Sequence, residues 1–120
     1  MAKLNTDEKL KLVTEAIEEH KGENLQIIDL RERTLIADYF VVVSGTSNVH
    51  MRAIVDGVVK KFKDQRQKRP SVEGTAKARW VLLDIGDVVV HVFAPEEREF
   101  YDIESLWKQL EETRSVRVTE

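Results

Sequence analysis

The sequence predicts a single α/β domain in which helices pack on a mixed β-sheet. Apolar residues recur at helical spacing in three segments, and two further segments have the apolar, β-branched composition of strands. The stretch RWVLLDIGDVVVHVF has the alternation and the turn of a β-hairpin. A chain of 120 residues that is 42% hydrophobic can bury one core, so we expect one domain over 1–120 with its core at about 6–112.

A helix is expected first. Its apolar residues recur at steps of three and four: Leu10, Val13, Ala16 and Ile17. Thr6 or Asp7 can cap this helix, which should cover about 7–20, and Gly22 can end it.

Two strands should follow the helix. The segment 24–30, NLQIIDL, places apolar residues on both of its faces, which suits a largely buried strand. Arg31, Glu32 and Arg33 should end it. The segment 39–45, YFVVVSG, has no charged residue and is dense in aromatic and β-branched side chains, so it should be an interior strand.

A second helix is expected after Gly45. Apolar residues on one of its faces would pack on the sheet: Met51, Ile54, Val55, Val58, Val59 and Phe62. Its outer face and its tail carry cations: Lys60, Lys61, Lys63, Arg66, Lys68 and Arg69. Lysines at a helix C-terminus commonly offset the negative end of the helix dipole, so a solvated helix end is the simpler interpretation. Pro70 should stop the helix, SVEG can form a short strand, and TAKA a loop.

The register of the hairpin can be derived from its turn. Gly86 and Asp87 form a suitable two-residue turn, which would pair Ile85 with Val88. Aliphatic side chains then share one face, which should be core: Val81, Leu83, Ile85, Val88, Val90 and Val92. The other face mixes aromatic, apolar and polar side chains: Trp80, Leu82, Asp84, Val89, His91 and Phe93.

Pro95 should begin a last helical region, EEREFYDIESLWKQLEE. Its apolar stripe is expected at helical spacing: Phe100, Ile103, Leu106, Trp107 and Leu110. The region is also rich in acidic residues: Glu96, Glu97, Glu99, Asp102, Glu104, Glu111 and Glu112. This charge would suit a basic protein partner, and solubility is the simpler alternative.

Ser44, Thr46 and Ser47 are candidate nucleophiles, because they lie where a strand turns into a helix. The hydrolase pattern G-x-S-x-G needs a second glycine, which this turn lacks, and a P-loop needs a Gly-Lys pair that is also missing. We therefore expect Thr46 or Ser47 to cap the second helix.

The same order of strand, Gly-Ser turn and helix is typical of nucleotidyltransferases, which hold Mg²⁺ between two carboxylates spaced D-x-D or D-x-E on a neighbouring strand. The residues after this turn, Asn48, Val49 and His50, supply no such pair, and Asp102 and Glu104 lie in a helical region. We expect a nucleotidyltransferase-like scaffold without the catalytic carboxylates. A nucleotide-binding enzyme is the alternative function.

No metal or cofactor site is expected. The chain has no cysteine, and His20, His50 and His91 lie in distant segments without a ligand pair. A net charge of −3 argues against a general polyanion binder. The N-terminus lacks an apolar signal core, and no run approaches the length of a membrane helix, so a cytoplasmic protein without a membrane segment is expected.

Three stretches, ADYFVVVSGTSNVHMRAI, VEG and ARWVLLDIGDVVVHVFAPEEREFYDIESLW, resemble the ribosomal silencing factor family, also called Iojap-like proteins. The resemblance runs from about Leu25 to Trp107 in order and without large gaps. It implies a small α/β fold, similar to nucleotidyltransferases but without activity. It also implies binding to the large ribosomal subunit through the ribosomal protein called L fourteen, which blocks joining of the small subunit when nutrients are scarce.

The resemblance further implies a contact surface built from Glu73, Trp80, Tyr101 and Asp102. Neighbouring contacts are implied for Asp38, Tyr39, His91 and Arg98. From the residues alone, Trp80 and Tyr101 could equally be core aromatics. A peripheral contact with ribosomal RNA is an alternative for part of the basic cluster, namely Lys60, Lys61, Lys63 and Arg66. The sequence leaves open whether two copies associate as a homodimer. The TAKA loop departs from related sequences, which often carry acidic or bulky residues there.

Overall fold

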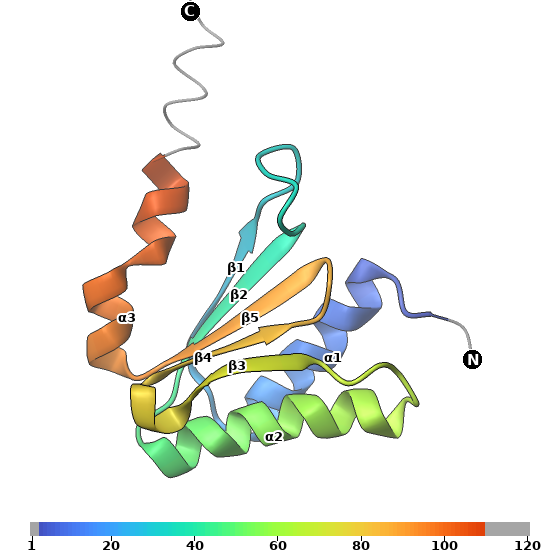
Figure 1. Cartoon of the computed structure of the whole chain (residues 1–120), viewed down its shortest axis with the longest axis horizontal. Coiled ribbons are helices and arrows are strands. Elements are labelled where there is room, and N and C mark those ends of the chain that lie inside the picture. Colours follow the sequence, from blue (N-terminus) through green and yellow to red (C-terminus); the bar gives the residue numbers. More distant parts are fainter. Residues whose placement is uncertain (1–2, 110–120) are drawn as a thin grey trace, which may run out of the picture.

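The computed structural model describes residues 3–109, which form a mixed five-stranded sheet packed by helices (Figure 1). The elements run in the order α1 (Thr6–Glu19), β1 (Glu23–Asp29), β2 (Tyr39–Ser44), α2 (Asn48–Asp64), β3 (Ser71–Thr75), η1 (Ala76–Ala78), β4 (Trp80–Asp84), β5 (Val88–Phe93) and α3 (Pro95–Tyr101). A further helical segment covers 103–109. The predicted α/β class is confirmed.

The central strands of the sheet are β2 and β5. The strand order is β1-β2-β5-β4-β3, with β2 and β5 parallel and every other neighbouring pair antiparallel. All of β5 is buried, and β2 is buried from Phe40 onward. The prediction that 39–45 contains an interior strand is therefore confirmed.

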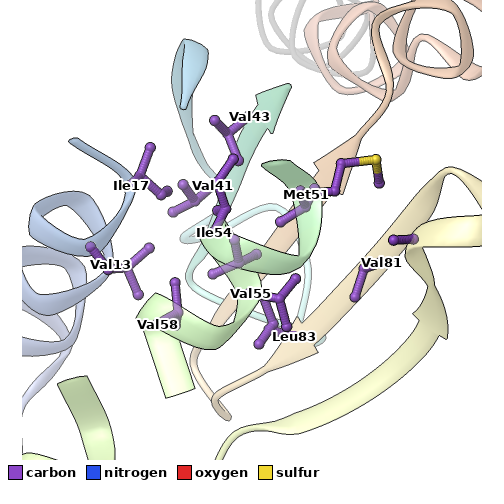
Figure 2. Close-up of a cluster of buried hydrophobic side chains, with 14 of the residues drawn as sticks. Val13, Ile17, Val41, Val43, Met51, Ile54, Val55, Val58, Val81 and Leu83 are labelled. Carbon is purple, nitrogen blue, oxygen red and sulfur yellow. The ribbon is translucent and has the colours of Figure 1, made fainter. Parts of the chain in front are cut away.

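The main core lies between the sheet and helices α1 and α2, which pack on the same face (Figure 2). Its members come from both helices and from three strands: Val13, Ile17, Val41, Val43, Met51, Ile54, Val55, Val58, Phe62, Val81, Leu83, Val88, Val90 and Val92. Each buried aliphatic side chain stabilises the fold by about 1.5–3 kcal/mol relative to an exposed one. The predicted packing stripe of the second helix is confirmed.

The first helix is capped by Asn5, so the prediction that Thr6 or Asp7 caps it is wrong. The Asn5 side chain accepts from the Glu8 backbone N–H at 2.8 Å, and the Glu8 carboxylate accepts from the Asn5 backbone N–H at 3.0 Å. This reciprocal pair is a capping box with the spacing N-x-x-E. At the other end, the Gly22 N–H closes the last turn by donating to a helix carbonyl at 2.8 Å.

Strand β1 forms close to its predicted position, but the prediction that it is largely buried is wrong. All of its residues are exposed or half-buried, and Ile27 is 47% exposed. The strand lies at a sheet edge, and its pairing with β2 shifts register between Glu23 and Gln26. An apolar pattern indicates a strand without indicating how well the helices cover that part of the sheet.

The hairpin β4–β5 has the predicted register. Val81 pairs with Val92 and Leu83 with Val90, and the Ile85 N–H donates to the Val88 carbonyl at 2.9 Å. Gly86 has a φ of 90°, a left-handed conformation that favours glycine. The aliphatic face of the hairpin therefore lies in the main core, and its mixed face points to the other side of the sheet, as predicted.

The last helical region is not continuous as predicted. Helix α3 ends at Tyr101, Asp102 has left-handed backbone angles (φ 44°, ψ 51°), and a new helical segment follows. Because of this break, the apolar side chains before and after Asp102 face different directions. Ile103 and Trp107 pack on a second apolar cluster, whereas Phe100 is 80% exposed. Leu110, Glu111 and Glu112, and with them the expected end of the core, lie outside the described residues.

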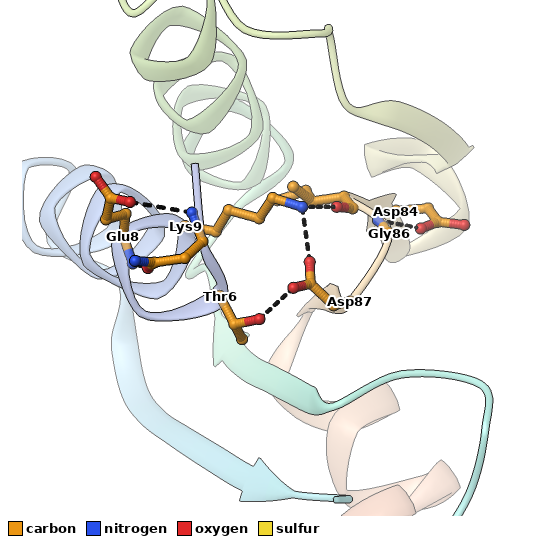
Figure 3. Close-up of polar contacts among 8 residues, drawn as sticks. Thr6, Glu8, Lys9, Asp84, Gly86 and Asp87 are labelled. Carbon is orange, nitrogen blue, oxygen red and sulfur yellow. Dashed lines mark hydrogen bonds and ion pairs between the residues drawn. The ribbon is translucent and has the colours of Figure 1, made fainter. Parts of the chain in front are cut away.

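Helix α1 is held to the β4–β5 turn by a partly buried polar contact (Figure 3). Lys9 donates to the Asp87 carboxylate at 2.7 Å and to the Ile85 carbonyl at 3.1 Å, and the Thr6 hydroxyl donates to Asp87. Burial raises the pKa of the Asp87 carboxyl, but the hydrogen bonds from Lys9 and Thr6 outweigh it and hold the pKa below its ordinary value.

Replacing Lys9 with methionine should lower the free energy of unfolding by about 1–2 kcal/mol at pH 7, because Asp87 would lose its ammonium partner. A depressed pKa stabilises the fold only while the carboxyl is ionised, so this deficit should shrink as the pH falls below about 4. Urea unfolding at pH 7 and pH 3 measures both effects. The matched control is Lys11→Met on the exposed side of α1, which should change stability by less than about 0.5 kcal/mol. Equal deficits at the two pH values would contradict the ionic role of Lys9.

Candidate partner-binding surface

The second face of the sheet carries a row of aromatic rings on β4 and β5. Trp80 pairs with Phe93 across the hairpin, and their rings are stacked with centroids 4.8 Å apart. Tyr101 of α3 lies on the same rings, with its centroid 4.8 Å from that of Trp80. Trp80 is half-buried, whereas Tyr101 is 50% exposed. The predicted contact residues Trp80 and Tyr101 are thus brought together.

His91 lies beneath Trp80 and is 4% exposed. The Trp80 indole N–H donates to His91 Nδ1 at 3.2 Å, so the neutral imidazole carries its proton on Nε2. Among the described residues, Nε2 has no hydrogen-bond partner. The His91 ring contacts the Phe40 ring edge to face, with centroids 4.6 Å apart. Burial lowers the pKa of His91 to about 4. His91 is therefore buried beneath Trp80 and orients its ring.

The exposed end of α3 extends the aromatic row. The rings of Phe100 and Tyr101 meet edge to face at 5.1 Å. We call Trp80, Phe100 and Tyr101 the aromatic surface. Phe100 was assigned to a core stripe by its spacing, and the sequence holds no signal that α3 would leave it in solvent. Aromatic residues exposed side by side commonly mark a protein contact site.

Acidic residues accompany the aromatic surface along the chain. Exposed acids lie in α3 and at the break after it, within a few residues of Phe100 and Tyr101: Glu96, Glu99 and Asp102. Asp102 also accepts from the Ser105 N–H at 3.3 Å and so begins the following helical segment. Arg79 is the neighbouring cation, and it pairs with Glu97 at 2.8 Å and with Glu96 at 3.8 Å.

Glu73 joins this surface from the edge strand β3. Thr75 pairs with Trp80 and Glu73 with Leu82, so the side chains of Glu73 and Trp80 point to the same face of the sheet. Gly74 between them has a φ of 80°, and a Cβ there would lie 2.5 Å from the Trp80 carbonyl oxygen. The VEG motif therefore needs its glycine because β3 approaches the Trp80 backbone closely.

Arg98 faces inward and connects four parts of the chain. Its guanidinium donates to both Glu104 oxygens at 2.8 and 3.2 Å, to Ser44 Oγ at 3.0 Å and to the Glu23 carbonyl at 3.4 Å. The side chain is 12% exposed. Arg98 thus fixes α3 against β2, β1 and the segment 103–109, and it supports the aromatic surface from behind.

Asp38 and Tyr39 lie at the opposite end of the sheet. Their backbone N–H groups both donate to the Asp87 carbonyl, at 2.8 and 3.1 Å. Tyr39 pairs with Val88 at the start of β5, whereas Trp80 pairs with Phe93 at its end, about 17 Å away at 3.3 Å per residue. The structure therefore does not bring these two residues together with the aromatic surface.

The turn after β2 is structural. Ser47 caps α2 by accepting from the His50 N–H at 3.0 Å, which confirms the prediction of a cap. His50 Nδ1 accepts from the Thr46 N–H at 2.8 Å, so its Nε2–H donates to the His20 carbonyl at 2.7 Å and ties α2 to the end of α1. Ser44 is buried and receives its bond from Arg98.

Within residues 3–109, no group of three or more histidines and acids is placed to hold a metal ion. Over the same part of the chain, no helix has both the length and the apolar character needed to cross a membrane. The pair Asp102 and Glu104 lies at a helix break, where Glu104 is bound to Arg98.

The fold defines a small α/β domain that carries the aromatic surface on one face of its sheet. The chain belongs to the ribosomal silencing factor family: residues 3–120 match the family described as "Ribosomal silencing factor during starvation". The resemblance seen in the sequence is therefore confirmed.

Relatives and solved structures agree with this assignment. A "Ribosomal silencing factor RsfS" from Halalkalibacterium halodurans is 38% identical over 87% of this chain and 89% of its own length. An Arabidopsis thaliana protein, "Protein Iojap-related, mitochondrial", is 33% identical over 72% of this chain and 50% of its own length. A crystal structure of a Chromobacterium violaceum protein superposes with a TM-score of 0.83, at 37% identity, over 88% of each chain.

The buried imidazole predicts a pH-dependent stability. Between pH 6.5 and about 4 the unfolded chain binds a proton at His91 that the folded chain does not bind, so stability should fall as the pH falls through this window. The loss should amount to up to about 3 kcal/mol. Urea unfolding at several pH values from 7.5 to 4 measures the free energy of unfolding. In His91→Gln this free energy should fall less steeply with falling pH than in the wild type. A variant with the slope of the wild type would contradict the assignment.

Proposed function

We propose that this protein binds the large ribosomal subunit through the ribosomal protein L fourteen and sterically blocks joining of the small subunit when nutrients are limiting. The observation that carries the proposal is the aromatic surface with its acidic surroundings. Family membership supports the same conclusion, because the family is described as a ribosomal silencing factor during starvation. We place this activity in the cytoplasm, where translation takes place.

The chemistry of the surface suits a basic protein partner. Trp80 and Tyr101 supply large ring areas that can be desolvated on contact, and aromatic residues are enriched among the side chains that dominate binding energy. Glu73 and Asp102 lie at the margin, where carboxylates can pair with lysine and arginine of a partner. Arg98 and His91 hold the rings in place before binding, which reduces the entropy lost on association.

The proposed mechanism needs no bond to be made or broken. A rigid domain bound on the joining side of one subunit excludes the other subunit by occupying its space. Tight binding and a fixed orientation are then the properties that matter.

Replacing Trp80 or Tyr101 with alanine should weaken binding to large ribosomal subunits by roughly 2 kcal/mol or more each, if they are central to the interface. Cosedimentation with purified large subunits measures binding, and circular dichroism checks that each variant is folded. Tyr39→Ala is the matched control, because Tyr39 is an aromatic residue at the other end of the sheet. Wild-type binding by folded Trp80→Ala and Tyr101→Ala would contradict the assignment of the aromatic surface as the binding site. A loss of binding in Tyr39→Ala alone would place the binding site at the other end of the sheet.

Adding the wild-type protein to separated subunits should reduce their reassociation, because the joining face would be occupied. Sucrose-gradient profiles of the reassociated ribosomes measure the effect. Tyr101→Ala at the same concentration should allow reassociation to recover. Unchanged reassociation at saturating wild-type protein would remove the proposed mechanism.

A further inference from the structure

A cavity of about 590 Å³ lies at the end of the molecule remote from the aromatic surface. Three parts of the chain form it: the N-terminal segment, the loop between α2 and β3, and the turn between β4 and β5. Apolar side chains contribute to its wall: Leu4, Phe62, Pro70 and Ile85. Cations contribute the larger share of its polar lining: Lys3, Lys9, Arg66, Lys68 and Arg69. We call this the basic cavity.

Four of these cations have no ionic partner within residues 3–109. Lys9 is bound to Asp87, as Figure 3 shows, and it also donates to the Ile85 carbonyl. Among the described residues, no ion pair involves the remaining cations: Lys3, Arg66, Lys68 and Arg69. One carboxylate, Asp84, belongs to the described lining, and it accepts from the Gly86 N–H at 2.8 Å. The cavity thus gathers positive charge that the described part of the chain does not neutralise.

The cations on the preceding helix differ in this respect. Lys60 pairs with Asp64 at 2.7 Å, and Lys61 pairs with Glu19 at 2.7 Å. Both are therefore already used within the fold, which makes them poor candidates for the RNA contact considered from the sequence. Lys68 and Arg69 lie beyond the end of α2, so an interaction with the helix dipole does not account for them.

The charge is divided between the two ends of the molecule. Helix α2 begins beside the β5 end that leads into α3, and its other end leads into the loop before β3 (Figure 1). That loop lines the basic cavity. The 17 residues of α2 separate the two ends by about 25 Å. The acidic surroundings of the aromatic surface thus occupy one end, and the unpaired cations occupy the other. A ribosomal surface offers both complements, because its proteins are largely basic and its RNA carries phosphates.

We propose that the basic cavity binds backbone phosphates of RNA. The identification of that RNA as ribosomal rests on the proposed function, whereas the binding of phosphates rests on the cavity alone. The chain has a net charge of −3, so it does not attract polyanions in general. It can attract phosphates only locally, as in the basic cavity, where a single RNA strand can present several of them. Three to four phosphates along one strand would neutralise the free cations.

The test is binding of a fluorescein-labelled RNA hairpin of arbitrary sequence, followed by anisotropy between about 50 and 200 mM salt. The wild type should bind with an affinity that falls steeply with salt. The variant Arg66→Gln/Lys68→Gln/Arg69→Gln should bind at least about tenfold more weakly at the lowest salt. The slope of its log binding constant against log salt concentration should be smaller in magnitude by about 2. All three side chains are exposed, so the variant should fold.

The matched control is Lys11→Gln/Lys60→Gln/Lys63→Gln, which removes the same charge from exposed positions outside the cavity. It should bind the hairpin as the wild type does. Failure of the wild type to bind, equal losses in both triple variants, or displacement of the hairpin by an equal concentration of ATP would overturn the proposal. Hairpin binding that persists in Trp80→Ala while subunit binding is lost would separate the two proposals, since the cavity would then act without the aromatic surface.

Discussion

The packing of α1 and α2 on the same face of the sheet determines the rest of the structure. Both helices bury their apolar stripes against β2, β4 and β5, and this contact forms the large core. The opposite face is left to the short helix α3 and the segment 103–109. The seven residues of α3 cannot cover a five-stranded sheet, so the Trp80 ring on β4 remains partly in solvent. The exposed aromatic residues are a direct result of this unequal covering.

The thin layer on that face is held by polar contacts as well as by the second apolar cluster. Arg98 connects α3 to Ser44 and to Glu104, and these bonds form in a largely buried site where solvent competes weakly. Trp80 is fixed by the bond from its indole to His91 as well as by stacking on Phe93. These contacts fix the Trp80 ring from two sides at the surface of the sheet.

Sequence patterns predicted those parts of the fold that depend on local chemistry. The β4–β5 register followed from the turn at Gly86, because a two-residue turn fixes all later pairs. Burial of β1 was predicted wrongly, because exposure depends on sheet order, which the strand's own residues do not encode. The break at Asp102 was missed because left-handed geometry there is adopted without glycine. That break exposes Phe100, and it also explains why the aromatic surface was only partly predicted.

The distortions in the two edge strands affect how the protein behaves in solution. Strand β1 shifts its register near Gln26, and Gly74 gives β3 a left-handed residue in mid-strand. A regular edge presents evenly spaced N–H and carbonyl groups, onto which another copy can add a strand. Both edges here interrupt that spacing. The backbone geometry of both edges therefore disfavours the addition of a strand from a second copy, which leaves side-chain contacts as the more favourable way for another protein to bind.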